Sequence, residues 1–417
     1  MPHYTISPGT PLSGIVKISG SKNSSLPILA AALLSDGPSV IQNVPDLSDV
    51  RNMCAILDYS GADCRRLSNG DLEICPNNCN TKTVPLELVS KLRASFLIIG
   101  PLLARHGRIR IPLPGGCQIG ARPIDLHLKG FEAMGAKVRQ GHGYVDIRCD
   151  RLCGAKIYLD FPSVGATENI MIAACLADGT TIIENAANEP EITDLANFLC
   201  VMGAEITGAG TDTIHIKGKS SMHPAVHRVI PDRIEAGTFM AISAVCKSQI
   251  TLENVIPNHL GSVIAKMREM GFCINECNNS IEIIPCEKFK SIDVKTLPYP
   301  GFPTDMQSQF MSLMSIADGT GVVIETIFEN RFMQVPELLR MGAKIKIDGR
   351  TAIIDGTKRL SGAQVRATDL RAGAALVIAA LAAQGQSEVS GIEHIERGYE
   401  NFEAKLSALG VNIKKYS

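Results

Sequence analysis

The hydrophobic positions of this chain follow a pattern that recurs six times. One part is an apolar run, a glycine and a short β-branched run, as in NIMIAACLADGTTIIENA. The other part is an amphipathic run that ends at a glycine and leads into an alternating strand pattern. The glycines of this second part are separated by 74, 68, 68, 71 and 68 residues; they are Gly61, Gly135, Gly203, Gly271, Gly342 and Gly410. The sequence therefore predicts six copies of one unit of about 70 residues.

Each unit should contain two helices, each capped by a left-handed glycine, with strands after them. The first helix is apolar nearly all round, so other elements must enclose it. The second has a polar face, as in NHLGSVIAKMREM, and should lie nearer solvent. Six such units fit two domains of three units each, with apolar helices inside and sheets outside.

The chain ends without the strands that should follow its last helix, whereas TISPGTPLSGIVKISG near its start has strand character. We therefore expect residues 21–229 to form one domain. Residues 1–20 and 230–417 should form the second, so that the chain starts and finishes in the same domain.

Composition narrows the class of protein. The 417 residues include 41 basic and 42 acidic side chains, 5% aromatics and no Trp, so neither nucleic acid nor an anionic membrane is an expected partner. The longest apolar runs are too short to span a membrane, and the N-terminus does not resemble a secretory signal. Thirteen scattered cysteines favour a reducing, cytoplasmic location. Their CxxxC spacings lack a histidine cluster, so we expect no structural zinc.

Two segments suggest chemistry. In GSKNSSLPILAAALL, Lys22 and Asn23 precede an apolar helix, whose N-terminus attracts anions. A solvated lysine beside an ordinary cap is the simpler interpretation of that segment alone. In IPLPGGCQIGARPIDLHLKG, Cys117 follows two glycines and comes shortly before Arg122, so its thiol could act as a nucleophile or a proton donor. The alternative is a buried apolar cysteine, which the flexible Gly-Gly pair makes less suitable.

Charged residues also recur where helices meet loops. The arginines in these positions could converge on a small phosphorylated substrate; they are Arg93, Arg331, Arg371 and Arg397. Asp305 and Asp369 each precede an apolar helix, which N-capping explains. If Asp305 faces a cleft instead, it is a candidate general base.

Taken together, these segments resemble the UDP-N-acetylglucosamine enolpyruvyl transferase family over essentially the whole chain. The motifs that carry the resemblance are SGSKNSSLPILAAALL, LRAS, LPGGCQIGARPIDLH, SVGATENIMIAA, ENAANEPEI, PDRIEAGTF, FPTDMQSQF, ENRFM, TDLRAGA and IERGYE. The resemblance implies an inverse α/β prism of two domains, each with three βαβαββ units, and an active site in the cleft between them. It also implies transfer of the enolpyruvyl group of phosphoenolpyruvate to the 3′-hydroxyl of UDP-N-acetylglucosamine, with release of phosphate, as the first committed step of peptidoglycan synthesis. Neither a metal nor an organic cofactor is implied.

The resemblance assigns roles to matching positions. Cys117 is the implied general acid and Asp305 the implied base, with Lys22 and Arg397 also at the reacting groups. The phosphoenolpyruvate ligands would be Lys22, Arg122 and Arg397, with Arg93, Arg331 and Arg371 nearby. Nucleotide and sugar contacts would come from Asn23, Arg122, Pro123, Ile124, Asp125, Leu126, Ser163, Val164, Gly165, Asp305 and Ile327. Asp369 and Glu189 would support the arginines.

Two positions depart from the family pattern, because Phe161 and Ser48 stand where many relatives carry lysine. Two alternatives also stay open. A sister enolpyruvyl transferase acts on shikimate 3-phosphate and shares the six-unit architecture, although its relatives lack the PGGC loop. A catalytically silent paralogue that binds a UDP-sugar is the other alternative, which intact Lys22, Cys117, Asp305 and Arg397 argue against.

Overall fold

The structure is a computed structural model that describes residues 2–7, 11–77, 79, 83–113 and 124–416. These residues divide into two compact units. Unit 1 contains residues 2–19 and 231–416, and unit 2 contains residues 20–113 and 124–230.

The described strands of unit 2 form three sheets. The first, in spatial order, is β13 (Val226–Arg228), β3 (Ser39–Gln42), β5 (Leu72–Cys75) and β4 (Asp63–Arg66). The second is β6 (Arg108–Pro112), β8 (Tyr144–Arg148) and β7 (Lys137–Gly141). The third is β11 (Glu205–Thr207), β12 (Thr213–Lys217), β10 (Thr180–Glu184) and β9 (Lys156–Tyr158).

Unit 1 repeats this plan. Its first sheet, in spatial order, is β15 (Cys273–Glu276), β16 (Ser280–Ile284), β14 (Ile250–Glu253) and β2 (Gly14–Lys17). The second is β17 (Val294–Lys295), β18 (Thr320–Ile324), β20 (Thr351–Asp355) and β19 (Lys344–Asp348). The third is β22 (Gln364–Arg366), β24 (Ser387–Ser390), β1 (His3–Ser7) and β25 (Asn412–Tyr416). A short pair, β21 (Leu360–Ser361) and β23 (Ala383–Gln384), lies beside them.

Each of the six main sheets has one inner and one outer helix, which matches the six predicted repeats. The inner helices are α1 (Lys22–Ala31), α4 (Ile99–His106), α6 (Val164–Ala174), α8 (Arg233–Val245), α10 (Gln307–Met314) and α12 (Leu370–Ala382). The outer helices are α2 (Ser48–Tyr59), α5 (Asp125–Ala133), α7 (Pro190–Val201), α9 (Gly261–Met270), α11 (Val335–Arg340) and α13 (Phe402–Ala408). The short helix α3 (Leu86–Val89) lies outside this scheme, and the 3₁₀ turns are η1 (Ala32–Leu34), η2 (Arg93–Ile98), η3 (Pro257–Leu260), η4 (Thr304–Met306) and η5 (Ile395–Arg397).

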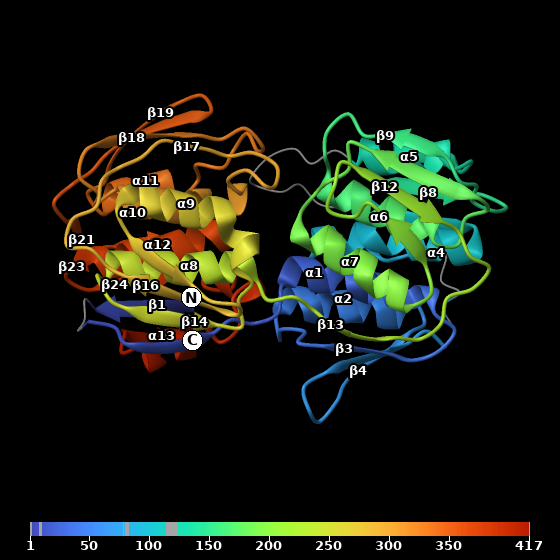
Figure 1. The fold of residues 1–417 in the computed structure, drawn as a ribbon, viewed down its shortest axis with the longest axis horizontal. Coiled ribbons are helices and arrows are strands. Elements are labelled where there is room, and N and C mark those ends of the chain that lie inside the picture. Colours follow the sequence, from blue (N-terminus) through green and yellow to red (C-terminus); the bar gives the residue numbers. More distant parts are fainter. Residues whose placement is uncertain (1, 8–10, 78, 80–82, 114–123, 417) are drawn as a thin grey trace. The chain divides into compact units, whose positions relative to one another are not determined.

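The apolar helices form the cores of their units, as predicted. In unit 1, α8, α10 and α12 pack against one another inside the sheets (Figure 1). Small residues allow close approach: in unit 2 a Cβ on Gly100 of α4 would lie 2.6 Å from the backbone oxygen of Asn169 in α6. The predicted inverse α/β prism, with helices inside and sheets outside, is confirmed for each unit.

The N-terminal strands complete sheets of the second half of the chain. Strand β1 lies between β24 and β25 and pairs antiparallel with both. It therefore supplies the strand that the last repeat lacks. Strand β2 pairs in parallel with β14 of the fourth repeat.

An asparagine in the left-handed conformation closes three of the parallel strand pairs. Asn43, Asn185 and Asn254 have φ of 58°, 55° and 56° and directly follow β3, β10 and β14. Their side-chain amides donate to carbonyl oxygens just beyond the neighbouring strand, namely those of Val229, Leu159 and Ile18. Asparagine tolerates this conformation better than most residues, so it both turns the chain and joins the two strand ends.

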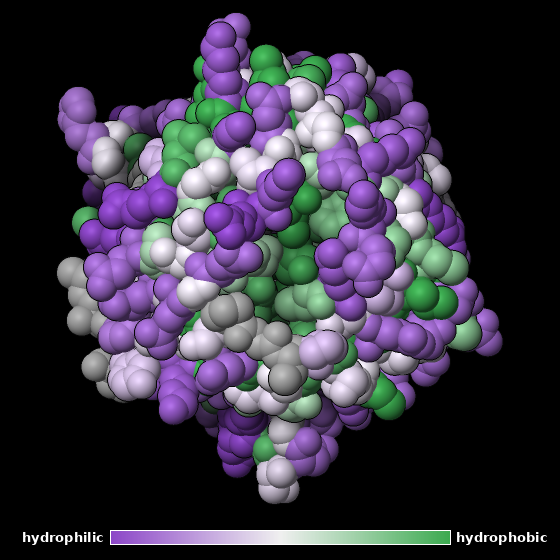
Figure 2. Space-filling model, turned by 90° about the vertical axis from the view of Figure 1, so that its left-hand side faces the viewer, coloured by the Kyte–Doolittle hydropathy of each residue, from purple (hydrophilic) through white to green (hydrophobic). Residues whose placement is uncertain are grey.

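Hydrophilic residues predominate on the face shown in Figure 2, where a group of hydrophobic residues lines a hollow near the centre. Among the helices of the described residues, none combines the length and apolar character that a membrane span requires.

Candidate functional site

Asp305 lies in the 3₁₀ turn η4, at the start of the inner helix α10 of unit 1. Its two carboxylate oxygens each accept a hydrogen bond of 2.8 Å, one from Arg331 and one from Arg371. The arginine side chains are only 3% and 4% exposed, whereas that of Asp305 is 28% exposed. Two buried cations therefore fix a carboxylate that still faces solvent. This arrangement fixes the orientation of the carboxylate.

A buried polar network lies beneath this pair of arginines. The hydroxyl of Tyr399 accepts from Arg371 at 3.3 Å and lies 2.9 Å from the hydroxyl of Thr238. Gln309 donates to the backbone oxygen of Asp305 at 2.9 Å. Burial opposes the charge of Arg371, but Asp305 and Tyr399 outweigh it and raise the pKa of the guanidinium. The guanidinium therefore stays charged.

The structure separates the two aspartates that N-capping could explain. Asp369 caps α12, because its Oδ1 accepts from the backbone N–H groups of Arg371 and Ala372 at 2.9 and 3.1 Å. Asp305 makes no such cap for α10, whose N-cap residue is Met306. The capping interpretation is thus confirmed for Asp369, while Asp305 instead pairs with arginines.

Two further predicted residues belong to unit 1. Ile327 follows β18, and its backbone N–H donates to the carboxylate of Glu325 at 2.8 Å. Arg397 ends the 3₁₀ turn η5, two residues before Tyr399.

Lys22 is the first residue of α1 in unit 2, and Ser21 caps that helix by accepting from Ser24 N–H. The Lys22 side chain is only 13% exposed, and its Nζ lies 3.5 Å from a carboxylate oxygen of Asp49 in α2. A freely solvated lysine is therefore the wrong interpretation. Asn23 follows it in the first turn of α1, and Ser48, one of the two departures, begins α2 next to Asp49.

A second group in unit 2 surrounds the N-terminus of α6. Ser163 caps this helix, and Val164 and Gly165 form its first turn. The imidazole of His127 lies against that turn, because a Cβ on Gly165 would be 3.4 Å from its Cε1. Arg93, at the start of η2, lies close enough to act electrostatically on His127.

His127 is held neutral. Burial, with Arg93 as a second cause, lowers its pKa to about 3. The amide nitrogen of Asn169 lies 3.1 Å from His127 Nδ1 and also donates to Phe96 O, while Asn169 Oδ1 accepts from Gly100 N–H. Because the amide nitrogen can only donate, Nδ1 is the acceptor and Nε2 carries the proton. An Nε2–H donor near a helix N-terminus is suited to an anion.

Three predicted nucleotide contacts stand directly before His127. Ile124 is the N-cap residue of α5, Asp125 is exposed at its first position, and Leu126 packs partly against the core of the unit. Cys117, Arg122 and Pro123 lie outside the described residues. The other departure, Phe161, is 45% exposed and lies two residues before the Ser163 cap.

Sequence reasoning missed three residues that organise these groups: His127, Tyr399 and Glu325. His127 lies in the segment DLHLKG, Tyr399 in RGYENF and Glu325 in VIETIF. The sequence of such a segment does not show how far a side chain is buried or which residues it bonds. No cluster of His, Cys, Asp or Glu suited to a metal ion occurs among the described residues.

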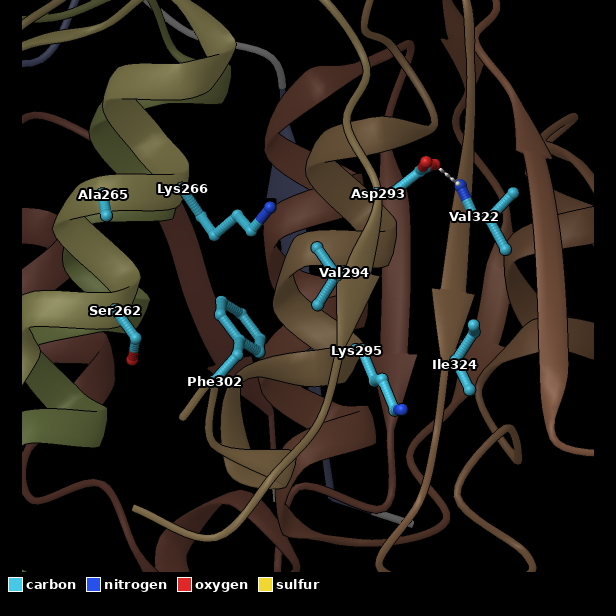
Figure 3. A pocket seen from close by; sticks show the side chains of 9 residues that line it. All are labelled: Ser262, Ala265, Lys266, Asp293, Val294, Lys295, Phe302, Val322 and Ile324. Carbon is cyan, nitrogen blue, oxygen red and sulfur yellow. Dashed lines mark hydrogen bonds between the residues drawn. The ribbon is translucent and has the colours of Figure 1, made fainter. Parts of the chain in front are cut away.

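A separate groove of about 520 Å³ lies on unit 1, between α9 and the strands β17 and β18. Val294 and Phe302 contribute apolar lining, and Lys266 and Lys295 contribute charge (Figure 3). Asp293 at its edge accepts from the backbone N–H of Val322 at 2.9 Å. None of the predicted site residues lines this groove.

Comparisons with known proteins agree on one family. The family described as EPSP synthase (3-phosphoshikimate 1-carboxyvinyltransferase) matches residues 6–406. UDP-N-acetylglucosamine 1-carboxyvinyltransferase 1 of Caldanaerobacter subterraneus subsp. tengcongensis is 57% identical over 98% of both chains.

Two solved structures share the fold. The enolpyruvyl transferase NikO from Streptomyces tendae superposes with a TM-score of 0.90 at 26% identity, covering 99% of this chain and 98% of its own. EPSP synthase from Acinetobacter baumannii covers both chains fully with a TM-score of 0.78, but at 17% identity it supports the fold alone. The chain therefore belongs to the EPSP synthase (3-phosphoshikimate 1-carboxyvinyltransferase) family of enolpyruvyl transferases.

Proposed function

We propose that this protein transfers the enolpyruvyl group of phosphoenolpyruvate to the 3′-hydroxyl of UDP-N-acetylglucosamine and releases phosphate. In this role it would make the first committed intermediate of peptidoglycan synthesis. The observation that carries the proposal is the 57% identity, over 98% of both chains, to a UDP-N-acetylglucosamine 1-carboxyvinyltransferase. The matched EPSP synthase shares only 17%.

The charged residues fit a small anion with a phosphate and a carboxylate. Unit 2 supplies Lys22 and Arg93, and unit 1 supplies Arg331, Arg371 and Arg397. The proposal requires both units to contribute ligands to one phosphoenolpyruvate, with Arg122 as a further ligand. Fixed cations in a site with little water stabilise developing negative charge far better than they do in bulk water.

The UDP moiety would bind to unit 2. The first turn of α6, which follows the Ser163 cap, would offer the backbone N–H groups of Val164 and Gly165 to a diphosphate. The segment from Arg122 to Leu126 would line the uridine pocket, and Asn23 and Ile327 would contact the sugar.

The reaction would proceed by addition and elimination. Cys117 gives a proton to the methylene carbon of phosphoenolpyruvate, and the sugar oxygen bonds to the adjacent carbon as Asp305 takes the hydroxyl proton. Loss of a methyl proton and cleavage of the C–O bond to phosphate then restore the double bond. Two guanidiniums beside Asp305 make its carboxylate a weaker base. The negative charge of bound phosphoenolpyruvate must therefore offset these guanidiniums before Asp305 can take the proton.

A phosphate-release assay with both substrates tests the proposal. Wild-type protein should release phosphate, Cys117→Ser should lose nearly all turnover, and Cys117→Asp should keep an acid with an altered pH profile. Cys153→Ser is the matched control, because Cys153 is an exposed thiol of unit 2 to which no role is assigned. Full activity of Cys117→Ser would exclude the assigned general acid.

The same assay separates the alternatives by their acceptor. Phosphate release with shikimate 3-phosphate in place of the UDP-sugar would identify the sister reaction. Binding of UDP-N-acetylglucosamine without any release of phosphate would identify a silent paralogue.

We further propose a cytoplasmic location. The twelve cysteines that the structure describes are free thiols, as expected in a reducing compartment.

A further inference from the structure

Glu325 is a buried carboxylate that touches two segments of the proposed site. It directly follows strand β18 of unit 1 and is 1% exposed. Its Oε1 accepts from the backbone N–H groups of Ile327 and Phe328 at 2.8 and 3.1 Å. Its Oε2 accepts from the hydroxyl of Thr304 at 3.0 Å. One side chain thus joins the loop of Ile327 to the turn of Asp305.

The neighbouring strand fixes Glu325 in turn. The hydroxyl of Thr296, just beyond β17, donates to Oε1 at 3.0 Å and accepts from the N–H of Thr326 at 2.9 Å. Within the described part of the chain, Glu325 forms no ion pair with a lysine or arginine. Four neutral donors therefore hold this buried carboxylate, and such fully bonded polar groups specify a single local geometry.

Arg331 and Glu325 both bond the turn of Asp305. Arg331 donates to the backbone oxygen of Thr304 at 3.4 Å and to the carboxylate of Asp305 at 2.8 Å. The Thr304 hydroxyl adds the bond to Glu325. Because Thr304 and Asp305 are adjacent, a shift of Thr304 would move the backbone that carries the Asp305 carboxylate between its two arginines.

We propose that Glu325 is a positioning residue that sets the proposed base, Asp305, and the acceptor-contacting loop at Ile327 at a fixed separation. This inference rests on the proposed function, since it concerns where the 3′-hydroxyl lies relative to its base. A displacement of about 1 Å at such a site is enough to lower turnover by orders of magnitude.

The bond from Glu325 to the Asp305 turn and its bonds to the Ile327 loop can be removed by separate substitutions. Thr304→Val replaces the hydroxyl with a methyl group of similar shape and cuts the bond to the Asp305 turn. We expect kcat to fall about tenfold or more, with the KM for UDP-N-acetylglucosamine changed less than about twofold. Thr304→Ser should restore wild-type kcat, because it keeps the hydroxyl.

Variants of Glu325 test its bonds to the loop of Ile327. Glu325→Ala should raise that KM and lower kcat together. Glu325→Gln should retain most activity, because its amide oxygen can accept the loop N–H groups and its nitrogen can donate to Thr304. Thr320→Val is the matched control: Thr320 also donates to a carboxylate, that of Asp355, but at the other end of β18.

Amide hydrogen exchange provides a readout that does not depend on the reaction. The N–H groups of Ile327 and Phe328 should exchange faster in Glu325→Ala and at the wild-type rate in Thr304→Val. Unchanged kcat in Thr304→Val, or unchanged exchange in Glu325→Ala, would overturn the positioning role. Wild-type protein without phosphate release would overturn the proposed function instead, and the exchange result would still decide whether Glu325 fixes the loop.

Discussion

The buried guanidiniums of Arg331 and Arg371 hold the carboxylate of Asp305 in position. Arg331 and Arg371 come from different repeats of unit 1, and each bonds one of its oxygens at 2.8 Å. A buried charge that loses its partner costs several kcal/mol, so these three residues depend on one another for folding as well as for any role in catalysis. Tyr399 extends the network, because Arg371 also donates to its hydroxyl.

His127 makes the stability of the protein depend on pH. Its folded pKa of about 3 lies below the ordinary value of 6.5, because burial and Arg93 disfavour the cation. The unfolded chain therefore binds an extra proton between these values. This contribution to stability is fully present above pH 6.5 and is lost as the pH falls towards 3, at a slope of about 1.4 kcal/mol per pH unit.

Urea unfolding across this pH range measures the effect. His127→Gln should be less steeply destabilised by acid than wild type. The exposed His223→Gln is the control and should follow the wild-type curve. Identical slopes for His127→Gln and wild type would contradict an imidazole that stays neutral in the folded protein.

Among the elements, the start of α12 is where capping is most directly testable. Asp369→Ala removes the acceptor for two helix N–H groups and should lower the free energy of unfolding by about 1 kcal/mol. Asp369→Asn keeps the cap oxygen and should change stability little. Denaturant titration distinguishes them, and an Asn variant as unstable as the Ala variant would point to the charge rather than the cap.

The strand ends show how one element fixes the next. Asn43 and Asn254 take the left-handed conformation and bond the carbonyl oxygens of Val229 and Ile18. At the corresponding end of β18, the hydroxyl of Thr326 donates to Thr296 O at 2.5 Å. Thr326 therefore joins the ends of β17 and β18, as the asparagines join the strand ends of other sheets. The loop that Glu325 holds follows directly after Thr326.

At the scale of the whole molecule, the chain passes between the units near residues 19–20 and 230–231. Each passage is bonded within its own unit: Asp232 N–H donates to Ser19 O in unit 1, and Ser21 N–H donates to Ile230 O in unit 2. In unit 1, Ser19 N–H also donates to Glu235, whose carboxylate pairs with Lys405. Burial raises the pKa of Glu235 to about 7, although Lys405 lowers it.

We expect the units to close when UDP-N-acetylglucosamine binds, because the proposed ligands come from both. Small-angle scattering should record a smaller radius of gyration with this nucleotide sugar than with glucose as a control. An unchanged radius would contradict closure.

Much of the architecture was predictable because it depends on local pattern. The six glycines of the second helices all have positive φ, from 89° to 114°. The first helix of the fourth repeat is followed by no glycine, and there Lys247 takes the left-handed conformation with a φ of 48°. The predicted left-handed glycine is wrong for the first helix of the first repeat, because the φ of Gly37 is not positive. Hydrophobic periodicity likewise identified the inner helices, since a helix that is apolar all round has few alternatives to burial.

The candidate site was predictable only in part. The motifs indicated Asp305, Arg331 and Arg371 as functional residues, but the sequence placed the arginines around a substrate and left Asp305 open between a cap and a base. The structure pairs the three with one another. His127 and Glu325 were not identified at all, because their importance lies in burial and in partners from other elements.

The sequence alone determined the repeat, the helices that form the core and the residue types available for chemistry, because each follows from spacing along the chain. Only the tertiary structure decided which charges meet, that Lys22 is paired with Asp49, and that one carboxylate joins two loops. The physical reason is that ion pairs and buried hydrogen bonds depend on distances of about 3 Å between residues far apart in sequence, and such distances exist only once the helices and sheets have packed.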